Sequence, residues 1–158
     1  MVIAIITQAR VGSSRLPRKI LKKLGDKTML DYHLLGLKKS TKTDVVIIAT
    51  THEEGVHEII EIAEANGFSV YQGSTSDVLS RYYHAASKFK ADIIVRVTSD
   101  CPLIDGGLID KAIVKLIHGQ YDIVSTDDTF PDGLDFSVFR MSSLRRAHNE
   151  AKLKSAEK

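Results

Sequence analysis

The chain has 158 residues, of which 43% are hydrophobic and 27% charged, and its 22 basic and 20 acidic side chains leave a net charge of only +2. A protein that coats nucleic acid would be far more basic, the single cysteine excludes a disulfide framework, and the first apolar run is too short to span a bilayer and lacks the features of a signal peptide. We therefore expect one cytoplasmic globular domain, residues 1–158, that binds neither nucleic acid nor a membrane.

Short strand-like runs alternate along the chain with amphipathic helical patterns. The runs at residues 2–6, 45–49 and 93–95 predict strands buried on both faces of a sheet, and shorter extended segments lie at 68–71, 121–125 and 133–139. Apolar residues at helical spacing predict helices at 29–39, 54–65, 77–89, 105–118 and 141–154. This alternation predicts an α/β fold, with a mostly parallel sheet and helices packed on it in a Rossmann-like, three-layer arrangement. Ligands of such folds bind beyond the carboxyl ends of the strands.

Positive charge is concentrated in the first part of the chain. Residues 1–42 hold ten Lys and Arg against two acids, whereas residues 43–80 hold seven acids and no Lys or Arg. Most of these lysines fit a solvated surface, but three cations surround a Gly-Ser-Ser turn directly after the first strand. Such a turn offers N–H and O–H donors to a phosphate chain, and Arg and Lys add fixed charge. Against the alternative of a basic loop without a ligand, we expect phosphate binding by Arg10, Gly12, Ser13, Ser14, Arg15 and Lys19.

The ends of later strands carry further polar residues. Asp100 lies at a turn just before Pro102, where a carboxylate can hold Mg²⁺, and its alternative role is that of a simple turn former. Asp105 is expected to cap the following helix. For the loop at 72–77 two interpretations stay open: Asp77 starts a helix and pairs with Arg81 at i,i+4, or the polar loop lies against a base or ribose.

The remaining reactive side chains predict no further chemistry. His52 and His57 stand at i,i+5 and cannot share a helix face as zinc ligands, and the other histidines fit the surface or a core in which their hydrogen bonds are satisfied. Cys101 has no evident partner for a thiolate mechanism and is expected to pack in the core. Tyr82 falls on the apolar side of its helix, which favours a core position over base stacking.

Several motifs together resemble a known family. Residues 9–21, A-R-V-G-S-S-R-L-P-R-K-I-L, look like the R-x-G-S-x-R-L-P-x-K signature of sugar nucleotidyltransferases. Further matching blocks are V-V-I-I-A-T-T at 45–51, G-S-T-S-D-V-L-S-R at 73–81, R-V-T-S-D-C-P-L-I-D at 96–105 and F-P-D-G-L-D at 130–135. In order and over nearly the whole chain, they resemble the spore coat polysaccharide biosynthesis protein F type of cytidylyltransferase, a relative of the acylneuraminate and 3-deoxy-manno-octulosonate synthetases.

The resemblance implies a nucleotide-diphospho-sugar transferase fold of the glycosyltransferase-A type. It implies transfer of CMP from CTP to an acidic sugar, with release of pyrophosphate, for surface polysaccharide biosynthesis. Mg²⁺ would be the cofactor, held by Asp100, with Arg15, Lys19 and Asp100 as the catalytic residues. The residues that would bind the nucleotide are Arg10, Gly12, Ser13, Ser14, Arg15 and Lys19 at the triphosphate, and Ala9, Ser74 and Asp77 near cytosine and ribose. Asp135 would lie on the acceptor side.

Two departures from the family pattern keep other functions open. Ser137 stands where the family has a carboxylate, and the carboxyl-terminal portion that helps to form the acceptor site and a dimer interface is missing, which leaves a homodimer undecided. One alternative is a nucleotide-binding module without catalysis. The other is a glycosyltransferase that uses a finished nucleotide-sugar, although Asp100-Cys101-Pro102 lacks the second Asp of an Asp-x-Asp metal motif.

Overall fold

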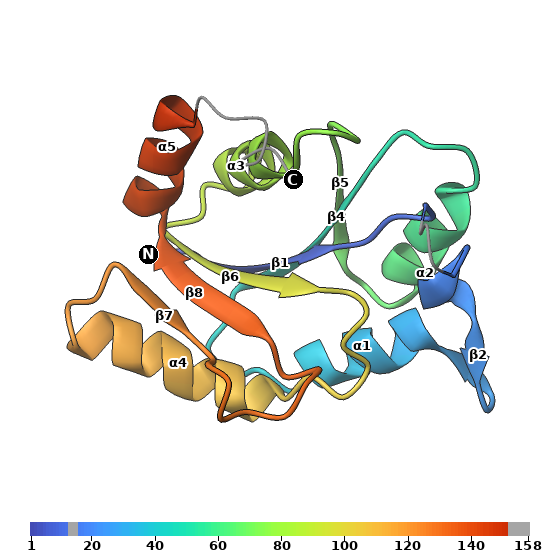
Figure 1. Cartoon of the computed structure of the whole chain (residues 1–158), viewed down its shortest axis with the longest axis horizontal. Coiled ribbons are helices and arrows are strands. Elements are labelled where there is room, and N and C mark those ends of the chain that lie inside the picture. The colour runs from blue at the N-terminus through green and yellow to red at the C-terminus, as the bar shows by residue number, and fades with distance from the viewer. Residues whose placement is uncertain (13–15, 152–158) are drawn as a thin grey trace.

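The strand-like runs of the sequence assemble into one six-stranded sheet with the order β5-β4-β1-β6-β8-β7. The computed structural model describes residues 1–12 and 16–151 (Figure 1). The strands of the sheet are β1 Ile3–Gln8, β4 Val45–Thr50, β5 Ser69–Gln72, β6 Ile93–Thr98, β7 Ile123–Ser125 and β8 Phe136–Arg140. The predicted α/β class with a mostly parallel sheet is confirmed.

Strand β1 occupies the middle of the sheet and pairs in parallel with β4 on one side and β6 on the other. Strand β5 continues the parallel part beyond β4. On the opposite edge β8 runs antiparallel to both β6 and β7. The carboxyl ends of β1, β4, β5 and β6 therefore meet along one edge, where ligands of open α/β sheets bind.

Helices cover both faces of the sheet, which explains why the first four residues of β1 are all apolar and buried (Figure 1). Ile3 and Ile5 belong to one core cluster, and Ala4 and Ile6 belong to the other. The first cluster packs under α1, α2 and α4, whereas the second packs under α3 and α5. The helices are α1 Met29–Leu37, α2 His57–Ala65, α3 Val78–Lys88, α4 Gly106–His118 and α5 Met141–Glu150.

Some boundaries differ from those that the sequence predicts. Helix α2 begins at His57 rather than at residue 54, because Gly55 has a φ of +81°, which is incompatible with a right-handed helix. A small hairpin of β2 (Lys23–Leu24) and β3 (Lys27–Thr28), with Gly25 at a φ of +73°, was not predicted. The last helix, expected to reach residue 154, ends at Glu150, and residues 152–158 lie outside the described part.

Two glycines let the end of α1 touch the chain before α4. A Cβ at Gly36 would lie 2.4 Å from the Ile104 carbonyl oxygen, and one at Gly106 would lie 2.4 Å from the Ser40 backbone nitrogen. Side chains at either place would force the two segments apart. The glycines thus hold the turn after β6, which carries Asp100, close to α1. A 3-10 helix, η1 (Lys19–Leu21), precedes the β2–β3 hairpin on the same side of the molecule (Figure 1).

Candidate active site

The chain after β1 forms a loop whose two ends are tied together. Ala9 is buried, and its backbone N–H donates to the Ala49 carbonyl of the neighbouring strand at 3.1 Å. The Arg18 N–H donates to the Val11 carbonyl at 3.3 Å, which closes the loop at its base. Arg10 and Gly12 are exposed within it, as expected of residues that meet a ligand. The predicted phosphate-binding residues Ser13, Ser14 and Arg15 lie outside the described residues.

A carboxylate also borders this loop. The Glu53 side chain lies so close that a Cβ at Gly12 would stand 3.1 Å from its Oε1. The Thr51 hydroxyl donates to Glu53 Oε2 at 2.8 Å and holds it in place. Sequence reasoning missed Glu53, although its position directly after β4, at the ligand edge of the sheet, is the signal that could have indicated it.

Lys19 and Asp100 meet across the carboxyl ends of β1 and β6. The Lys19 ammonium donates to Asp100 Oδ2 at 2.7 Å, although the residues are 81 positions apart in the chain. Partial burial by itself raises the pKa of Asp100, but hydrogen bonds from Lys19 and Thr98 outweigh it, so the net pKa is lowered and the carboxylate stays ionised. Side-chain exposures of 33% for Lys19 and 42% for Asp100 leave both groups open to a ligand.

From inside the core, His33 forms a hydrogen bond to the turn that carries Asp100. The side chain is fully buried, with Nδ1 2.9 Å from the Cys101 carbonyl and Nε2 2.8 Å from the Thr7 hydroxyl. Because a carbonyl only accepts, Nδ1 carries the proton and donates, and Nε2 accepts from Thr7. Burial lowers the pKa of His33 to about 4, so the ring is neutral. It links Thr7, near the carboxyl end of β1, to the residue after Asp100. A core position with satisfied hydrogen bonds is one of the two environments that the sequence predicted for this histidine.

Asp135 approaches the same turn from the segment before β8. It is exposed, and its carboxylate accepts the Gly133 N–H at 3.2 Å. Burial raises the pKa of the Cys101 thiol, and the nearby charges of Asp100 and Asp135 act in the same direction. Both carboxylates therefore flank this cysteine, which is buried as predicted. Ser137, two residues further along the chain, is paired with Arg96 in the register of β8 with β6.

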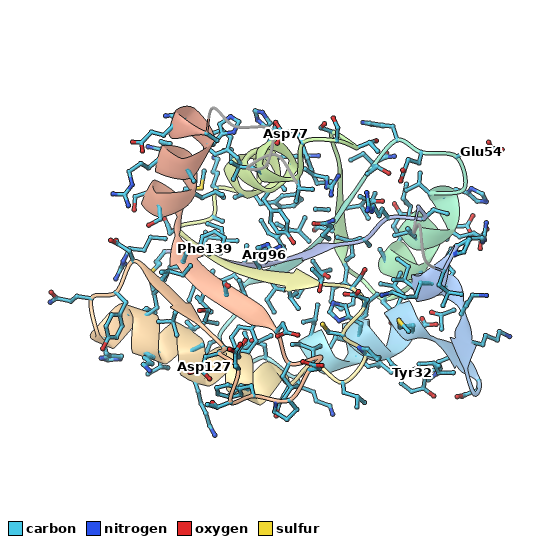
Figure 2. All side chains as sticks on the ribbon, in the orientation of Figure 1. Tyr32, Glu54, Asp77, Arg96, Asp127 and Phe139 are labelled. Atoms are coloured by element: carbon cyan, nitrogen blue, oxygen red, sulfur yellow. The ribbon has the colours of Figure 1, made fainter. Side chains whose placement is uncertain are left out.

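The loop between β5 and α3 contains Asp77, for which the sequence left open a helix start with an ion pair to Arg81, or a position against a base or ribose. Asp77 caps α3 by accepting the Ser80 N–H at 2.7 Å, and Ser74 Oγ accepts the Asp77 N–H at 3.0 Å (Figure 2). Asp77 therefore starts the helix as predicted, but Arg81 forms no ion pair with it, so the predicted pairing was wrong. Arg81 is only 1% exposed and donates from one terminal nitrogen to the Ser74 carbonyl. Burial lowers the pKa of Arg81, and nearby Arg10 lowers it further, while the charges of Tyr82, Glu53 and Asp77 oppose this.

A separate cavity of about 420 Å³ lies on the other side of α3, between that helix, α5 and the strands β6–β8. Its lining is mostly apolar, with Arg96 and Phe139 among the residues that surround it (Figure 2). Such a lining does not suit a polar nucleotide or sugar, and the strand-end residues above remain the candidate site. Tyr82, which also lines it, is buried as predicted.

Within residues 1–12 and 16–151, no cluster of three or more His, Cys, Asp or Glu side chains is arranged to hold a metal ion. Within the same ranges no helix combines the length and the apolar character needed to cross a membrane.

The sheet order, the helices on both faces and the strand-end site define the nucleotide-diphospho-sugar transferase fold. A solved structure of a cytidylyltransferase from Leptospira borgpetersenii superposes with a TM-score of 0.95 at 37% identity, and covers 99% of this chain and 68% of that one. Residues 4–157 match the cytidylyltransferase family. The chain belongs to this family, as the sequence motifs predicted.

Two curated relatives extend the comparison. An uncharacterized protein of Methanocaldococcus jannaschii is 43% identical over 154 residues, which are 98% of this chain and 63% of that protein. The spore coat polysaccharide biosynthesis protein SpsF of Bacillus subtilis is 36% identical over 116 residues, which are 70% of this chain and 48% of that protein. The matches thus span about half to two-thirds of the length of these relatives.

Proposed function

We propose that this chain binds CTP at the carboxyl ends of β1 and β6 and transfers CMP to an acidic sugar, with release of pyrophosphate. The observation that carries the proposal is the exposed Lys19–Asp100 pair beside the loop that follows β1. Membership of the cytidylyltransferase family supports the nucleotide and the reaction class. The similarity to SpsF supports a role in surface polysaccharide biosynthesis. The cytoplasmic location and a homodimer stay predictions.

In the proposed reaction, a hydroxyl oxygen of the sugar attacks the α-phosphorus of CTP. A new P–O bond forms, the bond to the oxygen bridging the α- and β-phosphates breaks, pyrophosphate leaves with the electron pair, and the hydroxyl proton passes to solvent. Negative charge grows on the leaving pyrophosphate. Fixed cations beside it, Lys19 and Arg10 together with the predicted Arg15, stabilise that charge without any covalent intermediate.

Mg²⁺ fits the residues that are present. This ion binds through one or two carboxylates together with phosphate oxygens and water, and Asp100 offers an ionised, accessible carboxylate beside the expected phosphates. When bound, Mg²⁺ would neutralise charge on the triphosphate. The hydrogen bond from Lys19 holds the Asp100 carboxylate in position.

Calorimetric titration with CTP, with and without MgCl₂, tests the nucleotide half of the proposal. Lys19→Met should weaken CTP binding by about tenfold or more, because it removes a charge-assisted phosphate contact. Asp100→Asn should abolish the gain in affinity that Mg²⁺ gives. Arg18→Met is the matched control, since the neighbouring Arg18 is an exposed cation that pairs with Glu58 instead, and it should leave binding unchanged.

Pyrophosphate release with 3-deoxy-manno-octulosonate as the probe sugar tests the reaction. Release that depends on Lys19 and Asp100 would support transfer. CTP binding without release, for this and other acidic sugars, would favour the alternative of a nucleotide-binding module. Tighter binding of a UDP- or GDP-sugar than of CTP would instead favour a glycosyltransferase.

A further inference from the structure

Arg81 is a buried cation whose hydrogen bonds are incomplete. It lies in the first turns of α3 and is 1% exposed, yet Nε and one terminal nitrogen have no hydrogen-bond partner among the described residues. The other terminal nitrogen donates to the Ser74 carbonyl. No carboxylate in the described ranges forms an ion pair with the guanidinium. An arginine stays protonated in proteins, so a charge with unpaired donors is held in the interior.

Such an arrangement works against the stability of the fold. Burying a charge and leaving its donors unpaired destabilises the folded state, and buried polar groups in proteins are nearly always satisfied. The stem of Arg81 is tightly packed, since a Cβ at Gly73 would lie 3.2 Å from its Cγ. A methionine or leucine would fill this space without the cost of the charge. The guanidinium is therefore better explained by a ligand that completes its hydrogen bonds than by the fold.

The position of Arg81 indicates which part of a nucleotide that ligand is. Helix α3 packs against β1 and β4, and Arg81 touches the Gly73–Ser74 segment that follows β5. The Lys19–Asp100 pair lies on the other side of β1, at the end of β6. Neighbouring strands are about 4.8 Å apart, so β6 and β4, which flank β1, are separated by roughly 10 Å. A nucleotide with its phosphates at Lys19 would thus extend its base toward Arg81.

This inference rests on the proposed function. We infer that Arg81 donates hydrogen bonds to the base of the nucleotide and thereby selects cytosine. The unpaired Nε–H and terminal N–H form a fork of two parallel donors. Cytosine presents two adjacent acceptors, O2 and N3, that match this fork, whereas uracil carries a proton on N3 that opposes it. A neutral base edge also suits a dry site better than a strongly hydrated phosphate does. Ser74, Thr75 and Ser76 are exposed, and the Ser74 carbonyl accepts a hydrogen bond from Arg81, so the base would approach the guanidinium beside this loop.

The first test measures stability without any ligand. Urea unfolding of Arg81→Met should give a midpoint equal to or above that of the wild type, because the variant keeps the packed stem and loses the unpaired charge. Arg140→Met is the matched control, since Arg140 is satisfied by the Tyr121 and Leu116 carbonyls and its loss should lower the midpoint. A drop for Arg81→Met as large as that of Arg140→Met would overturn the inference by showing a structural role.

The second test measures affinity for CTP, UTP, cytidine and inorganic pyrophosphate by calorimetry. The wild type should prefer CTP over UTP by about 10- to 100-fold, the range expected of a good bidentate contact. Arg81→Met should reduce this ratio to near one and weaken cytidine binding, with pyrophosphate binding unchanged. Arg81→Lys, which keeps the charge but not the fork, should also lose the preference.

The outcomes separate this inference from the proposed function. If the wild type binds CTP but Arg81→Met keeps both the affinity and the preference, the inference fails and the proposed function stands. If Arg81→Met weakens pyrophosphate as much as cytidine, the residue binds phosphate and the base-reading role is overturned. A wild type that binds CTP and UTP equally also overturns it. Failure of the wild type to bind any nucleotide would overturn the proposed function and the inference together.

Discussion

Acid should weaken this fold through His33, the neutral histidine that ties β1 to the turn carrying Asp100. Its pKa is lowered by burial from 6.5 to about 4. The unfolded chain therefore binds more protons than the folded chain between these two values, and the free energy of unfolding falls as the pH drops through that window. The contribution is fully present above pH 6.5 and is lost by about pH 4.

The size of the effect follows from the two pKa values. Between pH 7 and pH 5 the proton linkage of this single group amounts to about 2 kcal/mol of lost stability. For a domain of this length, that loss corresponds to a fall in melting temperature of roughly 4 to 8 °C. When the ring becomes protonated, Nδ1 keeps its hydrogen bond to the Cys101 carbonyl, but Nε2 can no longer accept a hydrogen bond from the Thr7 hydroxyl. The link between β1 and the Asp100 turn should therefore loosen over the same range.

Urea unfolding followed by far-ultraviolet circular dichroism, repeated from pH 7.5 to 4.5, measures this dependence. His33→Gln, which cannot titrate, should be less stable at neutral pH but should lose about 2 kcal/mol less than the wild type between pH 7 and pH 5. His118→Gln at an exposed position is the control and should retain the wild-type slope. Equal slopes for the wild type and His33→Gln would refute the assignment of a neutral, buried ring.

Two further predictions concern the contact between the end of α1 and the start of α4. Gly36→Ala should lower the free energy of unfolding by about 1 to 3 kcal/mol in urea titrations, because its Cβ would stand 2.4 Å from the Ile104 carbonyl oxygen. Gly107→Ala, with only a 3.2 Å contact to Asp105, should cost clearly less, and equal losses would contradict the packing argument. Asp105→Ala should cost about 1 kcal/mol in the same titration, because its carboxylate caps α4 through the Gly107 and Leu108 N–H groups. An unchanged midpoint would show that the cap adds nothing.

Local sequence was enough to predict the class of the fold and several of its details. The apolar run at 2–6 predicted a strand covered on both faces, and its alternation with helices predicted crossovers that make the sheet mostly parallel. Asp105 was recognised as a helix cap because capping depends on neighbouring residues alone. Helix starts were less certain, as Gly55 shows, because a single residue of positive φ delays α2 by a turn.

The family motifs indicated which strand ends to examine, since parallel strands bring their carboxyl ends to one edge. The motifs indicated Lys19 and Asp100 as site residues. The contact between these two side chains joins positions 81 residues apart in the chain, and it exists only because β1 and β6 are neighbours. Sequence spacing cannot give such a distance. The same is true of Glu53 beside Gly12.

Burial was decided by tertiary structure alone at His33 and Arg81. In the sequence, His33 is one histidine among several in helical patterns, and Arg81 stands four residues after an aspartate that it could pair with. Packing of α1 against the turn after β6 buried the His33 ring, lowered its pKa so that the ring is neutral, and gave it a hydrogen bond to that turn. Packing of α3 over β1 and β4 enclosed the arginine and left two of its nitrogens without hydrogen-bond partners among the described residues. The sequence supplied the chemical groups, and the surroundings that set their charge and their unmet hydrogen bonds arose only when distant segments packed together.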